Sequence, residues 1–204
     1  HGMKLIFVSR SKYRERYERV YHEELRVTYG NTLIIEEGGS NYHGVLGCTE
    51  IISELKLSFD YIYTAAGTGT TTAGLLLGVK EECVVSVPVF KNGEFIIDEV
   101  RKLLTQFQMG SDVLEEKMKL LKLSLNCHFG GYGKYNSELI YFINDLYKKT
   151  GIKFDQIYTA KMLYALLKDV ETGVVKENST VIALHTGGLQ GLSSIESRLD
   201  FSLD

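Results

Sequence analysis

Residues 61–77 decide the fold, and they read Tyr-Ile-Tyr-Thr-Ala-Ala-Gly-Thr-Gly-Thr-Thr-Thr-Ala-Gly-Leu-Leu-Leu. The run opens with an apolar strand signal at Tyr61–Tyr63, passes through a glycine- and threonine-rich turn at Gly67–Gly74, and enters a helix at Leu75–Leu77. The small residues let the backbone approach an anion, which the N–H groups of the first helical turn, the helix dipole and threonine hydroxyls would bind. The loop is not a Walker loop, and Thr72 stands where a dinucleotide fingerprint has its third glycine. Taken alone, it fits a phosphate cradle and a purely structural turn equally well.

The rest of the chain repeats this alternation of strand and helix. We expect further strands at 5–8, 33–35, 83–87, 123–127 and 180–184, and helices at 11–27, 45–55, 95–107, 114–121, 137–147 and 161–170. Strands that are nearly continuous in valine, isoleucine and leucine predict an α/β fold, a parallel sheet with helices on both faces. Ligands of such sheets bind beyond the carboxyl ends of the strands. The glycine-rich turns fall there, after Ile35, Tyr63, Cys127 and Leu184.

Composition narrows the function. The 204 residues are 44% hydrophobic, which is typical of a globular protein. Their net charge of −3 gives no excess of basic residues, so we expect no nucleic-acid partner. No apolar run is long enough to span a bilayer, so we expect no membrane partner. The scattered Cys48, Cys83 and Cys127 form neither a disulfide framework nor a zinc site, and they favour the reducing cytoplasm. We expect two domains, a small βαβ piece at 1–37 and a larger one at 38–204.

Four other turns carry residues that could do chemistry. Each is weak alone, because a turn, a packed tyrosine or a core histidine explains it as well. Together with the Gly67–Gly74 loop, they resemble the family of pyridoxal-phosphate enzymes typified by D-cysteine desulfhydrase and 1-aminocyclopropane-1-carboxylate deaminase. The segments that carry the resemblance are Glu36–Glu50, Gly67–Gly74, Gly131–Asn136, Tyr158–Met162 and His185–Gly188. They follow the family's order over nearly the whole chain.

The resemblance implies a fold and an activity. The fold would be three-layered and similar to the β subunit of tryptophan synthase (fold type II), incomplete at the N-terminus. The activity would be that of a lyase or deaminase that uses pyridoxal phosphate and a small amino acid and releases ammonia and a keto acid. The resemblance also implies a homodimer.

The resemblance assigns roles position by position. The cofactor phosphate would be held by Gly67, Thr68, Gly69, Thr70 and Thr71. Thr159 and Thr186, the latter beside Gly187, would lie near the pyridine nitrogen, and their neutral hydroxyls would leave that nitrogen largely unprotonated. The deaminases carry glutamate at the position of Thr159, so the chain is more similar to the desulfhydrase branch. Tyr132 and Tyr158 would line the substrate side and assist proton transfer.

The sequence departs from the family pattern in places. Tyr135 and Gln156 stand where prolines are usual, and Ala160 stands where a glycine is usual. The lysine that forms the Schiff base lies in the family upstream of the segment resembling residues 4–10, and neither Lys134 nor Lys161 matches it. His1-Gly2-Met3 leads at once into an apolar run, so we expect either a tag remnant or further residues upstream.

Two alternatives stay open. A degenerate homologue would bind pyridoxal phosphate, or another phosphate ligand, without catalysis. A nucleotide-binding Rossmann domain would explain only Gly67–Gly74 and leaves the segments around Tyr158 and His185 without a role.

Overall fold

The computed structural model describes residues 2–203 and divides into two compact units, residues 1–39 and 40–204. The first unit contains the helices α1 (Arg10–Arg14) and α2 (Arg19–Tyr29) and the short helix η1 (Glu37–Gly39). Ser9 begins α1, because its hydroxyl accepts a hydrogen bond from the Lys12 N–H at 3.1 Å. None of the residues from 2 to 39 is buried.

The strands expected at 5–8 and 33–35 do not form, and the helix expected at 11–27 is interrupted between α1 and α2. A strand is stable only when another strand satisfies its backbone hydrogen bonds, and residues 2–39 offer no such partner. The apolar side chains of both segments are exposed as a result, with Phe7 91% and Leu33 88% accessible.

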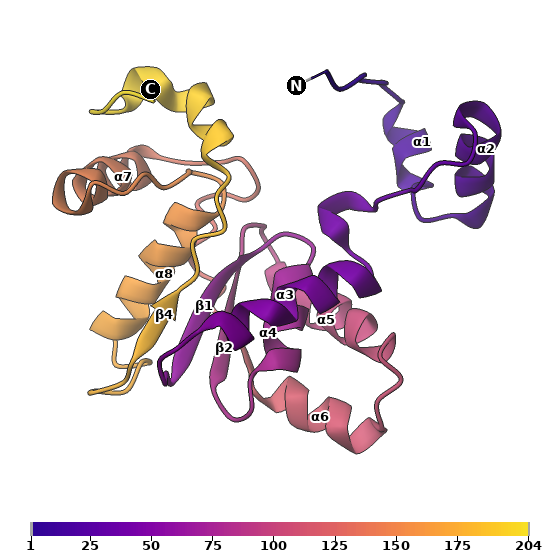
Figure 1. Ribbon diagram of the computed structural model, residues 1–204. Helices are drawn as coiled ribbons and strands as arrows, with labels where there is room; N and C mark the ends of the chain where they lie inside the picture. Colours follow the sequence, from indigo (N-terminus) through magenta and orange to yellow (C-terminus); the bar gives the residue numbers. More distant parts are fainter. Residues whose placement is uncertain (1, 204) are drawn as a thin grey trace. The chain divides into compact units, whose positions relative to one another are not determined.

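The second unit is built around a parallel four-stranded sheet (Figure 1). Its strands are β1 (Tyr61–Ala66), β2 (Cys83–Pro88), β3 (Leu121–Leu123) and β4 (Val181–Ala183), in the order β3-β2-β1-β4. The alternating strands and helices of the sequence therefore form the α/β fold that their pattern predicts.

Strand β3 ends earlier than the strand expected at 123–127. Along the β2–β3 ladder the Val84 N–H donates to the Leu120 carbonyl at 2.9 Å, and the Ser86 carbonyl accepts from the Ser124 N–H at 3.0 Å. The next donor in this series on β2 would be Pro88, which has no N–H. The ladder stops there, so β3 uses the first part of the apolar run.

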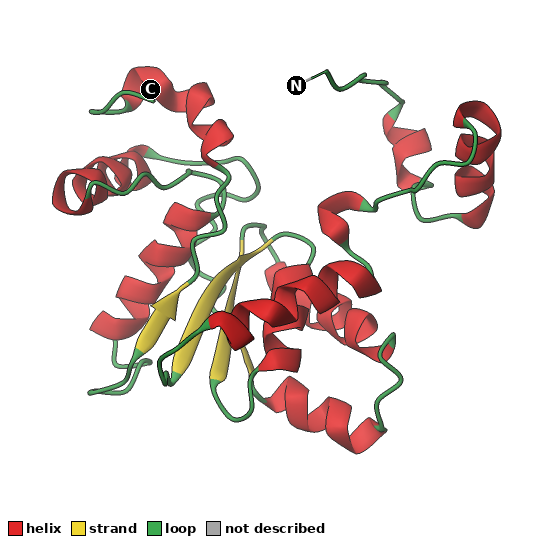
Figure 2. Ribbon diagram, viewed as in Figure 1, coloured by secondary structure: helices red, strands yellow, loops and turns green. Residues whose placement is uncertain are grey.

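Helices cover both faces of the sheet and make three layers (Figure 2). Packed over one face are α3 (Tyr42–Glu54), α4 (Thr70–Gly78), α5 (Ile96–Thr105) and α6 (Ser111–Lys119), with the short η2 (Gly93–Phe95) before α5. The other face packs against α8 (Thr159–Glu171), and α7 (Ser137–Thr150) and the 3-10 segment η3 (Leu189–Arg198) pack together with the start of α8. Within residues 2–203, no helix is both long and apolar enough to cross a membrane.

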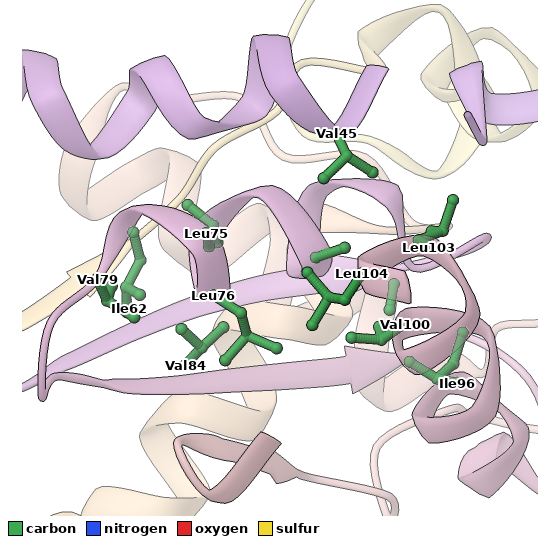
Figure 3. Close-up of a cluster of buried hydrophobic side chains, with 12 residues drawn as sticks. Val45, Ile62, Leu75, Leu76, Val79, Val84, Ile96, Val100, Leu103 and Leu104 are labelled. Atoms are coloured by element: carbon green, nitrogen blue, oxygen red, sulfur yellow. The ribbon is translucent and has the colours of Figure 1, made fainter. Parts of the chain in front are cut away.

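The largest cluster of buried side chains lies between the sheet and α3, α4 and α5 (Figure 3). Ile62 and Val84 project from the strands, and Leu75, Leu76 and Val100 meet them from the helices. The cluster fixes the direction in which α4 leaves β1, and with it the place of the glycine-rich turn between them.

Candidate active site at the carboxyl edge of the sheet

The turn from β1 into α4 has the geometry of an anion cradle. Gly69 precedes the helix in the left-handed region, with φ +83°, which an L side chain rarely adopts. The first N–H groups of α4, from Thr70 onward, have no acceptor within the helix because of helix geometry alone. The Thr68 and Thr70 hydroxyl oxygens lie 2.9 Å apart at the same place. Backbone donors, hydroxyls and the positive end of a helix therefore converge on one spot.

A second layer fixes this turn. The buried Thr72 hydroxyl is hydrogen-bonded to the Ser86 hydroxyl of β2 at 2.9 Å, which ties the first turn of α4 to the sheet. The Thr71 hydroxyl is next to the Cys48 thiol of α3. It partly offsets the rise in the pKa of Cys48 that burial causes. The cradle is thus held from two sides before any ligand binds.

Both tyrosines expected on the substrate side lie at this edge. A methyl group on Gly67 would be 3.4 Å from Cε1 of Tyr158, so the tyrosine ring lies directly over the turn. The ring of Tyr132 meets that of Tyr158 edge-on, with 6.0 Å between their centroids. Tyr132 also stacks on Phe90 at 5.4 Å and remains 53% exposed. The loops after β1, β2 and β3 and the start of α8 thus meet in one aromatic group.

The buried carboxylate of Asp155 organises the start of α8. Oδ2 accepts the N–H groups of Ile157 and Tyr158, each at 2.8 Å. Oδ1 accepts the N–H and hydroxyl of Thr159 at 2.8 and 2.7 Å. The Thr159 hydroxyl also accepts the Asp155 N–H at 3.0 Å. Thr159 is fully buried, and its proton is donated to Asp155.

The turn after β4 reaches the same carboxylate. A methyl group on Gly188 would lie 3.5 Å from Oδ1 of Asp155. His185 supports this turn, because its Nδ1 accepts the Gly187 N–H at 3.1 Å and its Nε2 is 2.8 Å from the Lys153 carbonyl. These two partners assign the proton to Nε2. Thr186 is exposed and makes no hydrogen bond within residues 2–203.

The structure therefore forms two neighbouring groups from the expected residues. The first group is the cradle with its two tyrosines: Gly67, Thr68, Gly69, Thr70, Thr71, Tyr132 and Tyr158. The second group contains Thr159, which binds Asp155, and the turn with Thr186 and Gly187, whose next residue Gly188 lies close to Asp155. Tyr158 belongs to both, since its N–H binds Asp155 while its ring covers Gly67.

Sequence reasoning missed Asp155, Phe90 and the buried environment of Lys161. The signal for Asp155 was present, because an aspartate shortly before a helix commonly caps it. Phe90 had only the weaker signal of an aromatic residue in a loop after a strand. Two hollows of about 360 and 280 Å³ flank β3 and contain none of the expected residues, so they are separate from this site.

The residues present fit a phosphorylated aromatic cofactor such as pyridoxal phosphate. The cradle offers neutral donors and a helix N-terminus to a phosphate dianion, which suits its charge. The adjoining tyrosine rings offer apolar faces to a planar ring. In the second group the proton of Thr159 is already donated, whereas the hydroxyl of Thr186 has no such bond within the described residues.

Comparison with known proteins finds relatives with the expected names. The chain is 32% identical to a Pyrococcus furiosus protein provisionally named 1-aminocyclopropane-1-carboxylate deaminase, over 88% of the chain and 56% of the relative. It is 28% identical to the Arabidopsis thaliana bifunctional D-cysteine desulfhydrase/1-aminocyclopropane-1-carboxylate deaminase, over 78% of the chain and 42% of that protein.

The solved structures agree with this relationship. A crystal structure of an ACC deaminase homologue superposes with a TM-score of 0.73 and 25% identity, covering 96% of this chain and 62% of that one. No family model matches the chain. The chain spans between 55% and 65% of the length of the first three curated relatives.

Proposed function

Because this chain is related to the family of D-cysteine desulfhydrases and 1-aminocyclopropane-1-carboxylate deaminases, we propose that residues 40–203 bind pyridoxal phosphate as part of a lyase or deaminase. The substrate would be a small amino acid, and the products ammonia and a keto acid. The observation that carries the proposal is the Gly67–Thr71 cradle at the N-terminus of α4, directly beneath the ring of Tyr158. A threonine at residue 159, where the deaminases carry glutamate, favours the desulfhydrase branch.

The chain's own residues would bind and orient the ligand. The N–H groups at the start of α4 and the hydroxyls of Thr68 and Thr70 would hold the phosphate. Thr186 would face the ring nitrogen in preference to Thr159, whose proton Asp155 already accepts. Pyridoxal phosphate, when bound, supplies an electron sink for chemistry at the α-carbon of an amino acid.

Tyr132 and Tyr158 would act on the substrate side. Their rings are in contact, so both hydroxyls can reach a small molecule bound over the cradle, where Oη of either residue could hold or pass a proton. Phe90 stacks behind Tyr132 and would keep water from that side. Asp155 would act through Tyr158 by fixing its backbone N–H.

A second candidate is a protein that binds the cofactor without turning it over. Lys161 favours this candidate, because this lysine near Tyr158 has its amine bound to two backbone carbonyls. The two candidates share the cradle and differ in whether an amine of the complete protein bonds covalently to the cofactor.

The cradle can be tested apart from any covalent bond. Pyridoxine phosphate carries an alcohol in place of the aldehyde, so it reports non-covalent binding alone. We expect T68A and T70A each to weaken its binding about tenfold in calorimetric titration, because each removes a hydrogen bond to a charged group. T105A removes an exposed hydroxyl of α5 and should leave binding unchanged. No binding by the unaltered chain would refute the proposal.

Borohydride reduction then separates the two candidates. Reduction with pyridoxal phosphate, followed by mass spectrometry, should give one specific pyridoxyl adduct on the complete protein if the enzyme proposal holds. Saturable binding of pyridoxine phosphate without such an adduct would favour the non-catalytic binder.

We also propose that the protein resides in a reducing compartment and forms a homodimer. The unpaired cysteines Cys48, Cys83 and Cys127 support a reducing compartment such as the cytoplasm. Burial raises the pKa of Cys127 to about 11, which keeps this thiol protonated and unreactive. The family resemblance supports a homodimer, which light scattering of the purified protein would test.

A further inference from the structure

Lys161 is buried in a way that lysine side chains rarely are. It lies in the first turn of α8 and has 0% accessibility. It forms no ion pair with any residue from 2 to 203. Nζ instead donates to the carbonyls of His128 and Gly131, at 2.9 Å each. An ammonium group held without a carboxylate partner is costly, so these two bonds are the main compensation for its burial.

The two carbonyls belong to one tight turn. The Gly131 N–H donates to the His128 carbonyl at 3.0 Å, and the Gly130 N–H donates to Nδ1 of His128 at 2.9 Å. Lys161 binds both ends of this turn. The next residue is Tyr132, whose ring stacks on Phe90 and meets Tyr158.

Lys161 and Tyr158 both belong to the start of α8. Tyr158 is the N-cap residue of the helix, and Lys161 is the third residue of the helix itself. The side chain of Lys161 therefore joins the helix start that carries Tyr158 to the turn that carries Tyr132, two segments far apart in sequence.

We propose that Lys161 is a positioning residue that sets the placement of Tyr132 against Tyr158, and thereby shapes the ring side of the ligand site and not its phosphate side. Its relevance to catalysis rests on the proposed function. The positioning itself follows from the two carbonyl bonds. The phosphate side depends on the cradle of α4, whereas both hydrogen bonds of the Lys161 amine go to the turn 128–131.

The test compares two ligands and three variants. K161M keeps an unbranched apolar side chain one atom shorter than lysine, and it removes the side-chain donor to both carbonyls. K161Q keeps an amide that can donate twice. K168M removes an exposed lysine of the same helix, which forms an ion pair with Glu171 and lies over the ring of Tyr164. Circular dichroism establishes that each variant is folded, and calorimetry measures binding of pyridoxine phosphate and of inorganic phosphate.

We expect K161M to weaken pyridoxine phosphate about tenfold or more, and inorganic phosphate less than twofold. K161Q should recover part of the loss, and K168M should bind both ligands like the unaltered chain. Equal losses for both ligands in folded K161M, or no loss for either, would overturn the proposal. If K161M does not fold, the same comparison is made with K161Q, for which a smaller but still selective loss is expected.

Hydrogen exchange keeps this inference separate from the proposed function. If the unaltered chain binds neither ligand, the proposed function fails, and exchange measured by mass spectrometry still decides the positioning. Amides of residues 128–132 should then exchange at least tenfold faster in K161M, while those of β1 and α4 keep their protection. Unchanged exchange at 128–132 would refute the positioning role.

Discussion

Asp155 concentrates four hydrogen bonds on one buried carboxylate, and three of their donors are consecutive backbone N–H groups. We expect D155A to lower the free energy of unfolding by about 2–4 kcal/mol, because it leaves buried donors at the start of α8 without an acceptor. Urea unfolding measures the change. D112N is the control, since Asp112 is exposed and its carboxylate accepts one hydrogen bond among the described residues, from the Ser111 hydroxyl. Equal stability of D155A and the unaltered chain would contradict this account of the helix start.

Lys161 predicts a pH dependence with a definite sign. Burial lowers its pKa from 10.5 to about 8, although the charge of Asp155 acts in the opposite direction. Between pH 8 and 10 the unfolded chain therefore holds a proton that the folded chain has released. Stability from this residue should rise with pH across that window, by at most about 1.4 kcal/mol per pH unit.

The measurement is the difference in unfolding free energy between the unaltered chain and K161M at pH 7.5, 8.5 and 9.5. Other groups that titrate, such as Cys127, are present in both proteins and largely cancel in that difference. A free-energy difference, unaltered chain minus K161M, that stays constant with pH would show that Lys161 keeps its ordinary pKa in the folded chain, and one that falls would show a raised pKa.

At the scale of elements, Gly74 sets how closely α3 packs on α4. A methyl group there would lie 2.3 Å from Cβ of Cys48 and 2.7 Å from the Val45 carbonyl oxygen. We expect G74A to destabilise the protein by about 2 kcal/mol or more, because overpacking outweighs the better helix propensity of alanine. Thermal unfolding with matched urea titrations measures the effect.

Gly47 supplies the control for this prediction. It lies within α3, is exposed, and a methyl group on it would meet nothing within 4 Å. G47A should therefore stabilise the protein by about 0.5–1 kcal/mol through helix propensity alone. If both alanine variants change stability in the same direction, the close approach at Gly74 is not what limits the packing.

Elements could be predicted from sequence where local pattern alone decides them. The β1–α4 unit follows from an apolar run, small residues and a helical repeat, all within residues 61–78. The end of β3 could not be located this way, because it depends on the missing N–H of Pro88 in a neighbouring strand. The apolar run at 5–8 matches a strand signal equally well, yet no strand pairs with it within residues 2–39.

The location of the site at the carboxyl edge of the sheet could be predicted from sequence, but the contacts between its side chains could not. Parallel strands bring their carboxyl ends together, so the turns after them had to meet. The contact between Tyr132 and Tyr158 and the stacking on Phe90 depend on three loops whose paths no spacing rule fixes. The expectation that Thr159 lies near the pyridine nitrogen came from resemblance alone. Its hydroxyl instead donates a hydrogen bond to Asp155, and this bond depends on the path of the chain between Asp155 and the start of α8.

At the scale of the whole molecule, the two units differ in what could stabilise them. Three clusters of buried side chains belong to residues 40–203, whereas none of the residues from 2 to 39 is buried. An eleven-residue helix such as α2 is marginal in water without a buried apolar face. We therefore expect residues 40–204 to carry the cooperative unfolding transition of the chain.

Deleting residues 1–39 tests this expectation. The shortened chain should unfold in one cooperative step within about 2 °C of the unaltered chain, because no buried apolar contact of residues 2–39 is lost. Hydrogen exchange on the unaltered chain provides an independent measurement. Amides of α1 and α2 should exchange near the rates of an unstructured peptide, while β1, β2 and α4 remain protected. Strong protection in α2, or loss of cooperative unfolding after the deletion, would mean that the first unit contributes stability that its burial does not reveal.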